Sequence, residues 1–550
     1  MARSPLFGSV SRAFRAAAIA SRNRPDLPPA DELIDMALSR RRFLGTSAAA
    51  AAALAAACGR AEAPPPPVQT APPPSGRPST PRIAIVGAGV AGLNAAYKLK
   101  QAGLTATVFE GSNRTGGRMF TASNLLGDGI TTELGGEFID SDHKEMLALM
   151  TEFGLDKLDV QAPAYASLKP ETYFINGRHY TQAQAARAFV PLAKRIAKDY
   201  DALGDVVDYK TEGGGTAIDR QTITQYFDHV GATGWMRELL EVAYVTEYGL
   251  EPGEQSALNF VFLIGTGDLE DDKALKLLGE SDERYKVKGG NQRVVDELAR
   301  RVAPQIRQLH RLEAIRSRNG GYTLTFQADG KVVDEDAEII LLAIPFSILR
   351  DVKISVDLPP LKTKAIRELG YGTNAKVLVG FKSRPWEKLG YSGATYSDEL
   401  FQLAWSNSFM QPGTAGGLTL YSGGRLGIEA GQGTKEEAAN RLMAGIERAY
   451  PGTTQERNPE KVSRFHWPSY PWTKGSYSCY KPGQWTTIAG SEGLPAGDIF
   501  FAGEHCSYDF QGFMNGGAQS GADAAKAIME RASTAKAARL YSRRALVHLA

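Results

Sequence analysis

Cysteine and histidine are scarce in this chain, which contains three Cys and seven His in 550 residues. Only Cys479 and Cys506 lie after Thr80, which excludes a disulfide-dense scaffold and leaves one bridge between them as an open question. The Cys and His show no metal-ligand spacing, so we expect no metal site. A strong excess of basic residues is missing too, because 63 Lys and Arg stand against 61 Asp and Glu. We therefore expect no nucleic-acid partner.

The apolar stretch near the start of the chain is too short to cross a membrane. Residues 45–57 are mostly Ala, whereas a transmembrane helix needs about 20 strongly apolar residues. The stretch follows Arg40, Arg41 and Arg42 in the sequence SRRRFL, a pattern typical of a twin-arginine export signal. We therefore interpret residues 1–58 as a twin-arginine signal region and expect a periplasmic or cell-envelope protein.

Two candidate processing sites follow the arginines. Leu54–Cys58 resembles a lipoprotein box, which would attach a lipid to Cys58 and tether the protein to a membrane. Ala61-Glu62-Ala63 suits ordinary signal peptidase instead, and the sequence leaves this choice open. Residues 59–80 are rich in Pro, so we expect an extended linker before the folded part.

A glycine-rich turn begins the folded part. The apolar residues 82–86 have the character of a central parallel strand, and they lead directly into the sequence GAGVAG. A helical pattern follows through Lys100, and a second strand, residues 106–109, ends at Glu110. Strand, turn, helix and acid together form the βαβ fingerprint of a dinucleotide-binding Rossmann fold.

Each residue of this fingerprint has a physical role. Gly87 permits the tight turn, Gly89 lets the backbone reach the pyrophosphate, and Gly92 lets the helix pack closely on the strand. The helix N-terminus favours the anionic phosphates. Glu110 is placed for the adenosine ribose hydroxyls, where an acid disfavours a 2′-phosphate. The fingerprint alone does not distinguish NAD from FAD.

The residues after the second strand favour FAD. Arg114, Gly117 and Arg118 lie in RTGGR, which resembles the RxGGR element of glutathione-reductase-like FAD proteins. Gly135 and Gly136 lie in ELGG, which resembles the flavin-contacting turn that follows this element.

A matching element lies near the other end of the chain. Residues 498–505 and 512–518 resemble the closing strand, loop and helix of the same proteins, with Gly503, Glu504 and Met514 near the cofactor. The resemblance implies that both ends of the chain build one FAD site.

Residues 81–530 as a whole resemble the flavin amine oxidases, a family of monoamine oxidases, polyamine oxidases and L-amino-acid oxidases. The resemblance implies an α/β fold in which a glutathione-reductase-like, FAD-binding Rossmann domain carries an inserted α+β substrate domain. The implied FAD-binding domain is discontinuous and comprises residues 81–150, 285–348 and 488–530. The substrate domain would comprise residues 151–284 and 349–487. Residues 531–550 form a C-terminal tail, interpreted as a surface helix or a frayed end.

The resemblance also assigns the chemistry to a few positions. Lys376 matches the family lysine that holds a water against the flavin, where a positive charge favours oxygen reduction. Tyr477 and Phe513 match an aromatic pair that forms a slot for the amine, and Trp467 matches a nearby tryptophan. Ser476 occupies the place of the cysteine that bonds to the flavin in mammalian monoamine oxidases. Serine cannot form that thioether, so we expect non-covalent FAD.

The sequence determines the substrate less closely than it determines the cofactor. Snake-type L-amino-acid oxidases place an Arg soon after the flavin-contacting turn to bind the carboxylate, but this chain has Glu137, Phe138, Ile139 and Asp140 there. Glu137, and less clearly Glu247 in the helical insert, would suit a substrate with a second positive charge. An L-amino acid stays open as well, because an Arg from elsewhere in the insert could bind its carboxylate.

We therefore expect oxidative deamination of a small amine or L-amino acid to an imine, then to an aldehyde or keto acid plus ammonia. The expected acceptor is O2, reduced to H2O2. One alternative is a flavin amine dehydrogenase with a cytochrome or quinone acceptor, and another is an FAD-dependent desaturase or isomerase of an apolar substrate. We also expect the protein to form an oligomer, and specifically a dimer.

Overall fold

The computed structural model describes residues 80–163, 166–169, 171–203, 206–264, 277–279 and 281–547, with side chains up to residue 533. The expected export signal, the lipid site at Cys58 and the Pro-rich linker lie outside these residues. Within the described part of the chain, no helix is both long enough and apolar enough to cross a membrane.

A five-stranded parallel sheet forms the first part of the fold. Its strand order is β20-β13-β1-β2-β9, and every neighbouring pair is parallel. The strands are β1 (Ile83–Val86), β2 (Ala106–Phe109), β9 (Ile306–Arg307), β13 (Ile339–Leu342) and β20 (Ile499–Phe501). β1 and β13 are buried along their whole length, as central parallel strands are when both faces are covered.

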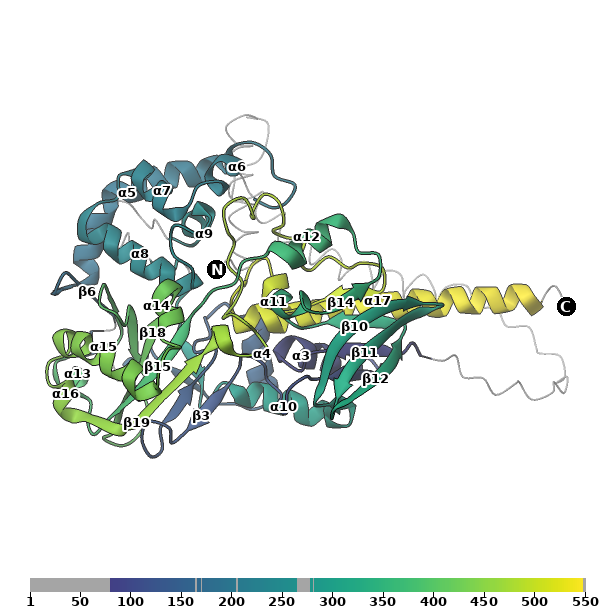
Figure 1. Ribbon diagram of the computed structural model, residues 1–550, viewed down its shortest axis with the longest axis horizontal. Coiled ribbons are helices and arrows are strands. Elements are labelled where there is room, and N and C mark those ends of the chain that lie inside the picture. Colours follow the sequence, from purple (N-terminus) through teal and green to yellow (C-terminus); the bar gives the residue numbers. More distant parts are fainter. Residues whose placement is uncertain are drawn as a thin grey trace, which may run out of the picture. The chain divides into compact units, whose positions relative to one another are not determined.

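Three helices cover one face of this sheet. α3 (Val90–Gln101) connects β1 to β2, and α10 (Gln292–Val302) and α17 (Met514–Val547) pack against α3. Figure 1 shows the yellow α17 beside the purple α3, although the two helices lie near opposite ends of the described chain. The Rossmann fold expected from the glycine motif is confirmed, and the helical backbone of α17 continues to Val547.

Three strands between β9 and β13 in the chain, together with β14 after β13, form a four-stranded sheet. Its order is β12-β11-β10-β14, with β10 (His310–Arg318), β11 (Gly321–Ala328), β12 (Lys331–Ala337) and β14 (Lys353–Ser355). It packs on the first sheet, where the rings of Phe109 and Phe326 stack with centroids 4.4 Å apart. β14 pairs with β10, so this part of the molecule extends beyond the expected boundary at residue 348.

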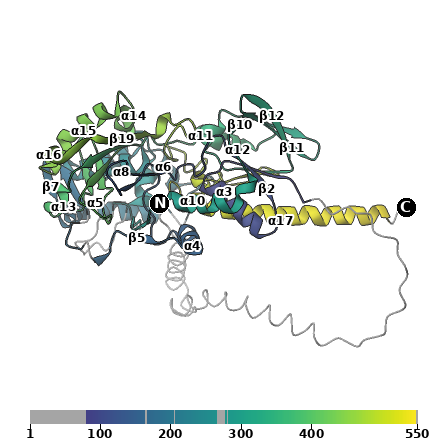
Figure 2. The same cartoon turned by 90° about the horizontal axis from the view of Figure 1, so that it is seen from below.

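A seven-stranded sheet forms the second large part. Its order is β19-β15-β18-β17-β16-β6-β7, and all pairs except β16 with β6 are antiparallel. The strands are β6 (Thr172–Ile175), β7 (Arg178–Tyr180), β15 (Ala375–Phe381), β16 (Thr395–Ser397), β17 (Leu403–Ser406), β18 (Gly416–Ser422) and β19 (Arg457–His466). Figures 1 and 2 both place this sheet and α15 (Lys435–Ala449) at the opposite end of the described part from β10, β11 and β12.

The alternation of β15 decides which of its side chains reach the site. Val377 and Val379 point into a core shared with α15, whereas Lys376 and Leu378 point to the other face because strand side chains alternate. Lys376 belongs to the wall of a cavity on that face. A one-residue slip in this strand would exchange the two faces and remove the lysine from the site.

A helical insert packs on the same large sheet. α8 (Gly234–Tyr248) contacts β6, β16, β17 and β18. Thr181 and Thr222 begin α5 and α7 with complete capping boxes, each of which stabilises its helix by about 1 kcal/mol. The other helices of the insert are α5 (Gln182–Ala202), α6 (Gly214–Asp219), α7 (Ile223–Val230) and α9 (Ala257–Leu263).

Short elements complete the described chain. The helices are α4 (Lys144–Glu152), α11 (Phe346–Leu349), α12 (Pro360–Glu368), α13 (Pro385–Lys388), α14 (Gly424–Glu429) and α16 (Thr453–Glu456). The strands are β3 (Thr121–Ser123), β4 (Thr131–Glu133), β5 (Lys157–Asp159) and β8 (Tyr285–Val287), paired as β3 with β4 and β5 with β8.

Candidate active site

One cavity brings together nearly all of the residues singled out in the sequence, and its wall combines residues of the five-stranded and seven-stranded sheets. The predicted residues in its wall are Gly87, Gly89, Glu110, Arg114, Gly117, Arg118, Gly135, Gly136, Glu137, Glu247, Lys376, Trp467, Tyr477, Gly503, Glu504, Phe513 and Met514. Gly92 is not among them, because it packs α3 against β1.

Two glycines of the turn between β1 and α3 have no room for a side chain. A Cβ on Gly87 would lie 2.6 Å from the Ala343 carbonyl oxygen, and a Cβ on Gly92 would lie 2.0 Å from the Gly87 carbonyl oxygen. Gly87 also has a positive φ of 104°, which L side chains rarely adopt. The α3 N-terminus has no side-chain cap and no acid in its first turn, so its N–H groups face the cavity as an anion-binding site.

Glu110 is fixed at the end of β2 by three donors. Its Oε2 accepts from the Ala88 N–H at 2.8 Å, and its Oε1 accepts from both the N–H and the hydroxyl of Ser112 at 2.8 Å. The carboxylate is therefore held beside the glycine turn, where the sequence places the adenosine ribose.

Arg118 joins the two ends of the chain. Its guanidinium donates to Glu504 Oε1 at 2.8 Å and to the Ser476 carbonyl oxygen at 2.9 Å. Glu504 also accepts from the Ser478 hydroxyl at 2.6 Å and from the Gly512 N–H at 2.9 Å. Burial opposes the charge of Glu504, but Arg118 and these donors hold its pKa below the usual range. Three segments far apart in the sequence thus meet at one ion pair.

Lys376 belongs to a buried group of three charges. Its Nζ lies 2.7 Å from Glu137 Oε2 and donates to the Gly135 carbonyl oxygen at 2.8 Å. Lys286 binds the other carboxylate oxygen, with its Nζ 2.5 Å from Glu137 Oε1. Burial alone would raise the pKa of Glu137, but the two lysines lower it. Lys286 was not singled out in the sequence, where nothing marks a lysine in the middle of a short strand.

This pairing corrects the interpretation of Glu137. We expected its carboxylate to meet a positive charge on the substrate, but both of its oxygens already bind lysines. Glu137 instead holds Lys376 in the cavity wall.

The three predicted aromatic residues all line the cavity. The Tyr477 hydroxyl donates to the Glu247 carbonyl oxygen at 2.5 Å and lies 3.0 Å from the Tyr421 hydroxyl. The Phe513 ring contacts the ring of His143 edge to face, with centroids 5.1 Å apart. The Trp467 indole N–H donates to the Leu134 carbonyl oxygen at 3.1 Å. Each aromatic side chain therefore has a contact that fixes its position.

Three further carboxylates line the same cavity, in addition to those of Glu110, Glu137 and Glu504. Glu171 precedes β6, Glu247 lies near the end of α8, and Glu283 precedes β8. Burial raises the pKa of each, and for Glu283 the neighbouring acids raise it further. Only Glu247 was identified from the sequence, because the three positions lie far apart along the chain and no local motif connects them.

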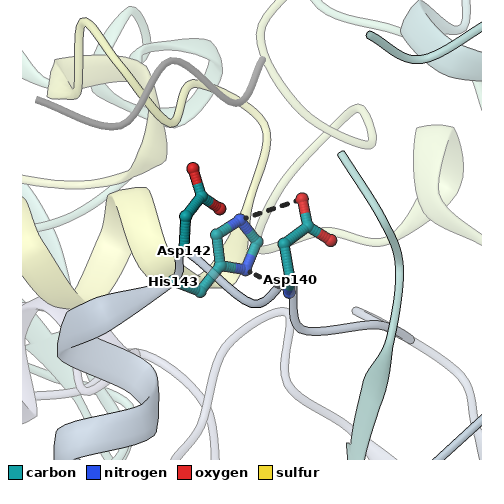
Figure 3. A group of neighbouring side chains, drawn as sticks. All are labelled: Asp140, Asp142 and His143. Atoms are coloured by element: carbon teal, nitrogen blue, oxygen red, sulfur yellow. Dashed lines mark hydrogen bonds and ion pairs between the residues drawn. The ribbon is translucent and has the colours of Figure 1, made fainter. Parts of the chain in front are cut away.

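A turn beside the cavity contains Asp140, Asp142 and His143, which Figure 3 shows together. Their side-chain ligand atoms lie within 4.8 Å of one another. However, His143 Nδ1 accepts from the Asp140 N–H at 2.9 Å, and burial lowers the pKa of His143 to about 3. The neutral ring therefore carries its proton on Nε2 and has no lone pair there for a metal. Asp140 Oδ2 lies 3.4 Å from this nitrogen.

The open question of a bridge between the two late cysteines is answered by the structure. Cys479 and Cys506 are both free thiols. The Cys479 sulfur lies 3.5 Å from the Asn259 amide nitrogen, and the Cys506 sulfur lies 3.5 Å from the Glu492 carbonyl oxygen. Burial raises the pKa of both thiols, so neither has the character of a reactive thiolate.

The cradle fits an FAD molecule in its shape and charge. A Cβ on Gly136 would lie 2.7 Å from the Met514 side chain, and a Cβ on Gly135 would lie 1.9 Å from the Arg118 carbonyl oxygen, so this turn must stay free of side chains. The uncapped α3 N-terminus would hold the pyrophosphate, and Glu110 the ribose. The Ser476 hydroxyl donates to Asn374 Oδ1 at 2.6 Å, with no thiol at this position. The fold and the site thus define a flavoprotein oxidoreductase.

Comparison with known proteins identifies the family. The model of the flavin containing amine oxidoreductases matches residues 90–529, and the chain belongs to this family. The protein is therefore an enzyme, an FAD-dependent oxidoreductase acting on CH–NH2 donors of amines or amino acids, and it binds FAD non-covalently.

Individual relatives are distant but span most of the chain. An amine oxidase [flavin-containing] of Oncorhynchus mykiss is 23% identical over 473 residues, which cover 81% of this chain and 85% of that protein. A putative L-amino-acid oxidase, YobN, of Bacillus subtilis (strain 168) is 25% identical over 474 residues, covering 80% and 92%. The solved structure of a cyclohexylamine oxidase from Brevibacterium oxydans IH-35A has a TM-score of 0.71 at 24% identity, covering 82% and 99%.

Proposed function

We propose that this protein is an oxidase of small primary amines, with O2 as the acceptor and H2O2 as a product. The amine would become an imine, which hydrolyses in water to an aldehyde and ammonia. FAD, when bound, supplies the two-electron oxidation of the carbon–nitrogen bond. The observation that carries the proposal is Lys376, a buried and ion-paired lysine in the wall of an aromatic cavity that also contains the dinucleotide cradle.

The aromatic residues favour the neutral form of the amine substrate. Tyr477, Phe513 and Trp467 exclude water from one part of the cavity, and an apolar wall disfavours the ammonium form of the substrate. The neutral amine is the reactive form, because its nitrogen lone pair supports loss of hydrogen from the adjacent carbon. The contacts of these rings with Glu247, His143 and Leu134 keep them in place.

Lys376 provides a fixed positive charge. Its Nζ is held by Glu137 and by the Gly135 carbonyl oxygen, so it needs no rearrangement when negative charge develops on an oxygen molecule nearby. Preorganised charge of this kind in a site shielded from water stabilises such a species strongly. This argument favours O2 as the acceptor.

The wall favours an amine over an α-amino acid. A bound carboxylate would need an unpaired cation near the aromatic residues. Among the described residues of the wall, Lys376 and Arg118 contact this region, and they are already paired with Glu137 and Glu504.

The stoichiometry of the reaction tests whether O2 is the electron acceptor. Purified enzyme and one oxidisable amine should consume O2 and form H2O2 and aldehyde in equal amounts, measured with an oxygen electrode, a peroxidase assay and an aldehyde reagent. Slow O2 consumption with fast dye reduction would overturn the oxidase and identify a dehydrogenase. Failure of every amine to react in either assay would favour a desaturase or isomerase.

A further inference from the structure

The cavity has an acidic region in addition to its aromatic one. Glu171, Glu247 and Glu283 come from three separate elements and reach the same wall, beside Tyr396 and Tyr421. Both Glu247 and Glu283 are half-buried, and both line the cavity.

Two of these carboxylates have no partner among the residues that the structure describes. Within the described part of the chain, no side chain or backbone group donates a hydrogen bond to the carboxylate of Glu247 or Glu283, and neither forms an ion pair. Glu171 accepts from the Tyr173 hydroxyl at 2.7 Å. The other acids in this interior are bound, as Glu504 is by Arg118 and Glu492 by the Tyr480 hydroxyl. Half-buried charges without partners are costly unless water or a ligand binds them.

Glu283 is also held in an unfavourable backbone conformation. Its φ is 42°, a left-handed value that costs a residue with a side chain about 1 kcal/mol or more. Asp140 keeps it there, since Oδ1 accepts from the Glu283 N–H at 3.0 Å and Oδ2 accepts from the Ser281 hydroxyl at 2.6 Å. Ser141 reinforces the turn by donating its N–H to Asp282 at 2.9 Å. The Asp140 turn in Figure 3 thus positions an unpaired carboxylate in the cavity.

The register of the large sheet aligns a row of cavity residues that leads away from Lys376. Lys376, Tyr421, Leu403 and Tyr396 are successive cross-strand partners on β15, β18, β17 and β16, and all four line the cavity. Neighbouring strands lie about 4.8 Å apart, so this row spans roughly 14 Å. Glu247 lies beside this row, because its carbonyl oxygen accepts from the Tyr477 hydroxyl, which is 3.0 Å from the Tyr421 hydroxyl. Glu283 lines the same cavity.

We propose that Glu247 and Glu283, supported by Glu171, bind a second ammonium group of the substrate, which is therefore a diamine or polyamine. The inference rests on the proposed amine oxidase function. One amine would lie neutral among Tyr477, Phe513 and Trp467, and the other would lie charged between the carboxylates. The side chains of Tyr421, Leu403 and Tyr396 form the floor between the two regions and contact the alkyl chain. The raised pKa values of the carboxyls agree with a site that a bound cation would stabilise.

The experiment compares a diamine with the monoamine of the same four-carbon chain. Each is mixed with the flavoprotein without oxygen, and the rate of flavin bleaching gives kcat/KM for the reductive step. Wild type should prefer the diamine by at least about tenfold, because only the diamine can form a buried ammonium–carboxylate pair with the acidic region.

Isosteric variants identify the residues responsible. Glu247→Gln and Glu283→Gln should each reduce the diamine-to-monoamine ratio of kcat/KM by about tenfold or more. Glu238→Gln is the matched control, because Glu238 lies on the same helix as Glu247 but outside the cavity wall, and its partner is the Asn176 amide. It should leave the ratio unchanged. The flavin spectrum of each variant shows whether it has folded and bound FAD.

The outcomes separate this proposal from the function on which it rests. A wild type that oxidises both amines equally, or variants that lower both rates in proportion, would overturn the second ammonium site and leave the amine oxidase standing. If neither amine nor any other bleaches the flavin, the amine oxidase function itself fails.

Discussion

At the scale of one residue, the buried carboxylate of Glu137 forms ion pairs with two lysines at once. It lies between Lys376 and Lys286 and is the ion-pair partner of both. Glu137→Gln would leave two lysines without a negative partner in the interior. Breaking such a buried pair destabilises a protein by about 3–5 kcal/mol. We expect a lower midpoint of thermal unfolding, measured by circular dichroism at matched flavin content.

Lys286→Met provides the comparison for that variant. It removes one lysine but preserves the contact between Lys376 and Glu137, so its midpoint should fall less. Equal midpoints for Glu137→Gln and wild type would show that the three charges do not stabilise one another.

The carboxyls of the acidic region also predict a pH dependence. Burial raises the pKa of Glu247 and of Glu283. The pKa of Glu283 is raised further by its acidic neighbours Glu247, Asp140, Glu171 and Glu137. A raised pKa means that the carboxylate is lost earlier as the pH falls, and with it the attraction for a second ammonium. The diamine-to-monoamine ratio of kcat/KM should therefore fall with decreasing pH.

The ratio is the quantity to measure, because the titration of the reacting amine affects both substrates. A ratio that stays constant with pH would contradict the assignment of these carboxylates.

Single residues were predicted from the sequence with mixed success. Lys376, Tyr477 and Phe513 were found because the residues around them match a family pattern, and the structure places all three in one cavity. Lys286, Glu171 and Glu283 were missed because their role depends on partners far away in the sequence. The role of Glu137 was misjudged for the same reason, since a glutamate beside a glycine turn does not reveal two distant lysines.

At the scale of elements, the β1–α3 turn leaves no room for a side chain at Gly92. A Cβ on Gly92 would meet the Gly87 carbonyl oxygen at 2.0 Å, a backbone atom that cannot move aside. Gly92→Ala should therefore push α3 away from β1 and disturb the FAD cradle. We expect purified protein with a much lower ratio of flavin to protein absorbance than wild type.

Gly103→Ala is the control for this substitution. Gly103 follows the same helix at a φ of 78°, and no atom lies within 4 Å of the position that an added methyl group would take. Its replacement costs about 1 kcal/mol of backbone strain and should leave the flavin content intact. Full flavin in Gly92→Ala would show that the close packing of α3 is not needed for the cofactor.

The elements around this turn could be predicted because the signal is local. The apolar strand, the three glycines and the helix pattern lie in one short stretch of sequence, and the structure has β1 and α3 where the sequence places them. The row from Lys376 to Tyr396 could not be predicted, because it depends on pairing among strands that are distant in the sequence.

At the scale of the whole molecule, the two ends of the chain close one site. Arg118 near the start and Glu504 near the end form an ion pair of 2.8 Å, and α17 packs on α3. The Rossmann architecture was predictable, because motifs at both ends belong to one kind of cofactor site. The division at residue 348 stays a prediction, and β14, which lies beyond it, pairs with β10.

The architecture agrees with our proposal that the twin-arginine route exports this protein. That route carries folded proteins, which suits an enzyme whose cofactor site needs both ends of the chain. Replacing Arg40 and Arg41 by Lys should retain the protein inside the cell, measured by fractionation and immunoblotting. Replacing Arg22 and Arg24, which precede the SRRRFL sequence, by Lys should leave export unchanged. Normal export of the first variant would contradict the proposal.

The most direct test of the central claim is the absorbance of the purified flavoprotein, mixed without oxygen with monoamines, diamines or polyamines, and L-amino acids in turn. The account predicts that amines bleach the flavin, diamines or polyamines fastest, and that air restores the oxidised spectrum. Bleaching by L-amino acids alone would contradict the amine assignment, and no bleaching by any of them would contradict amine oxidation as the function.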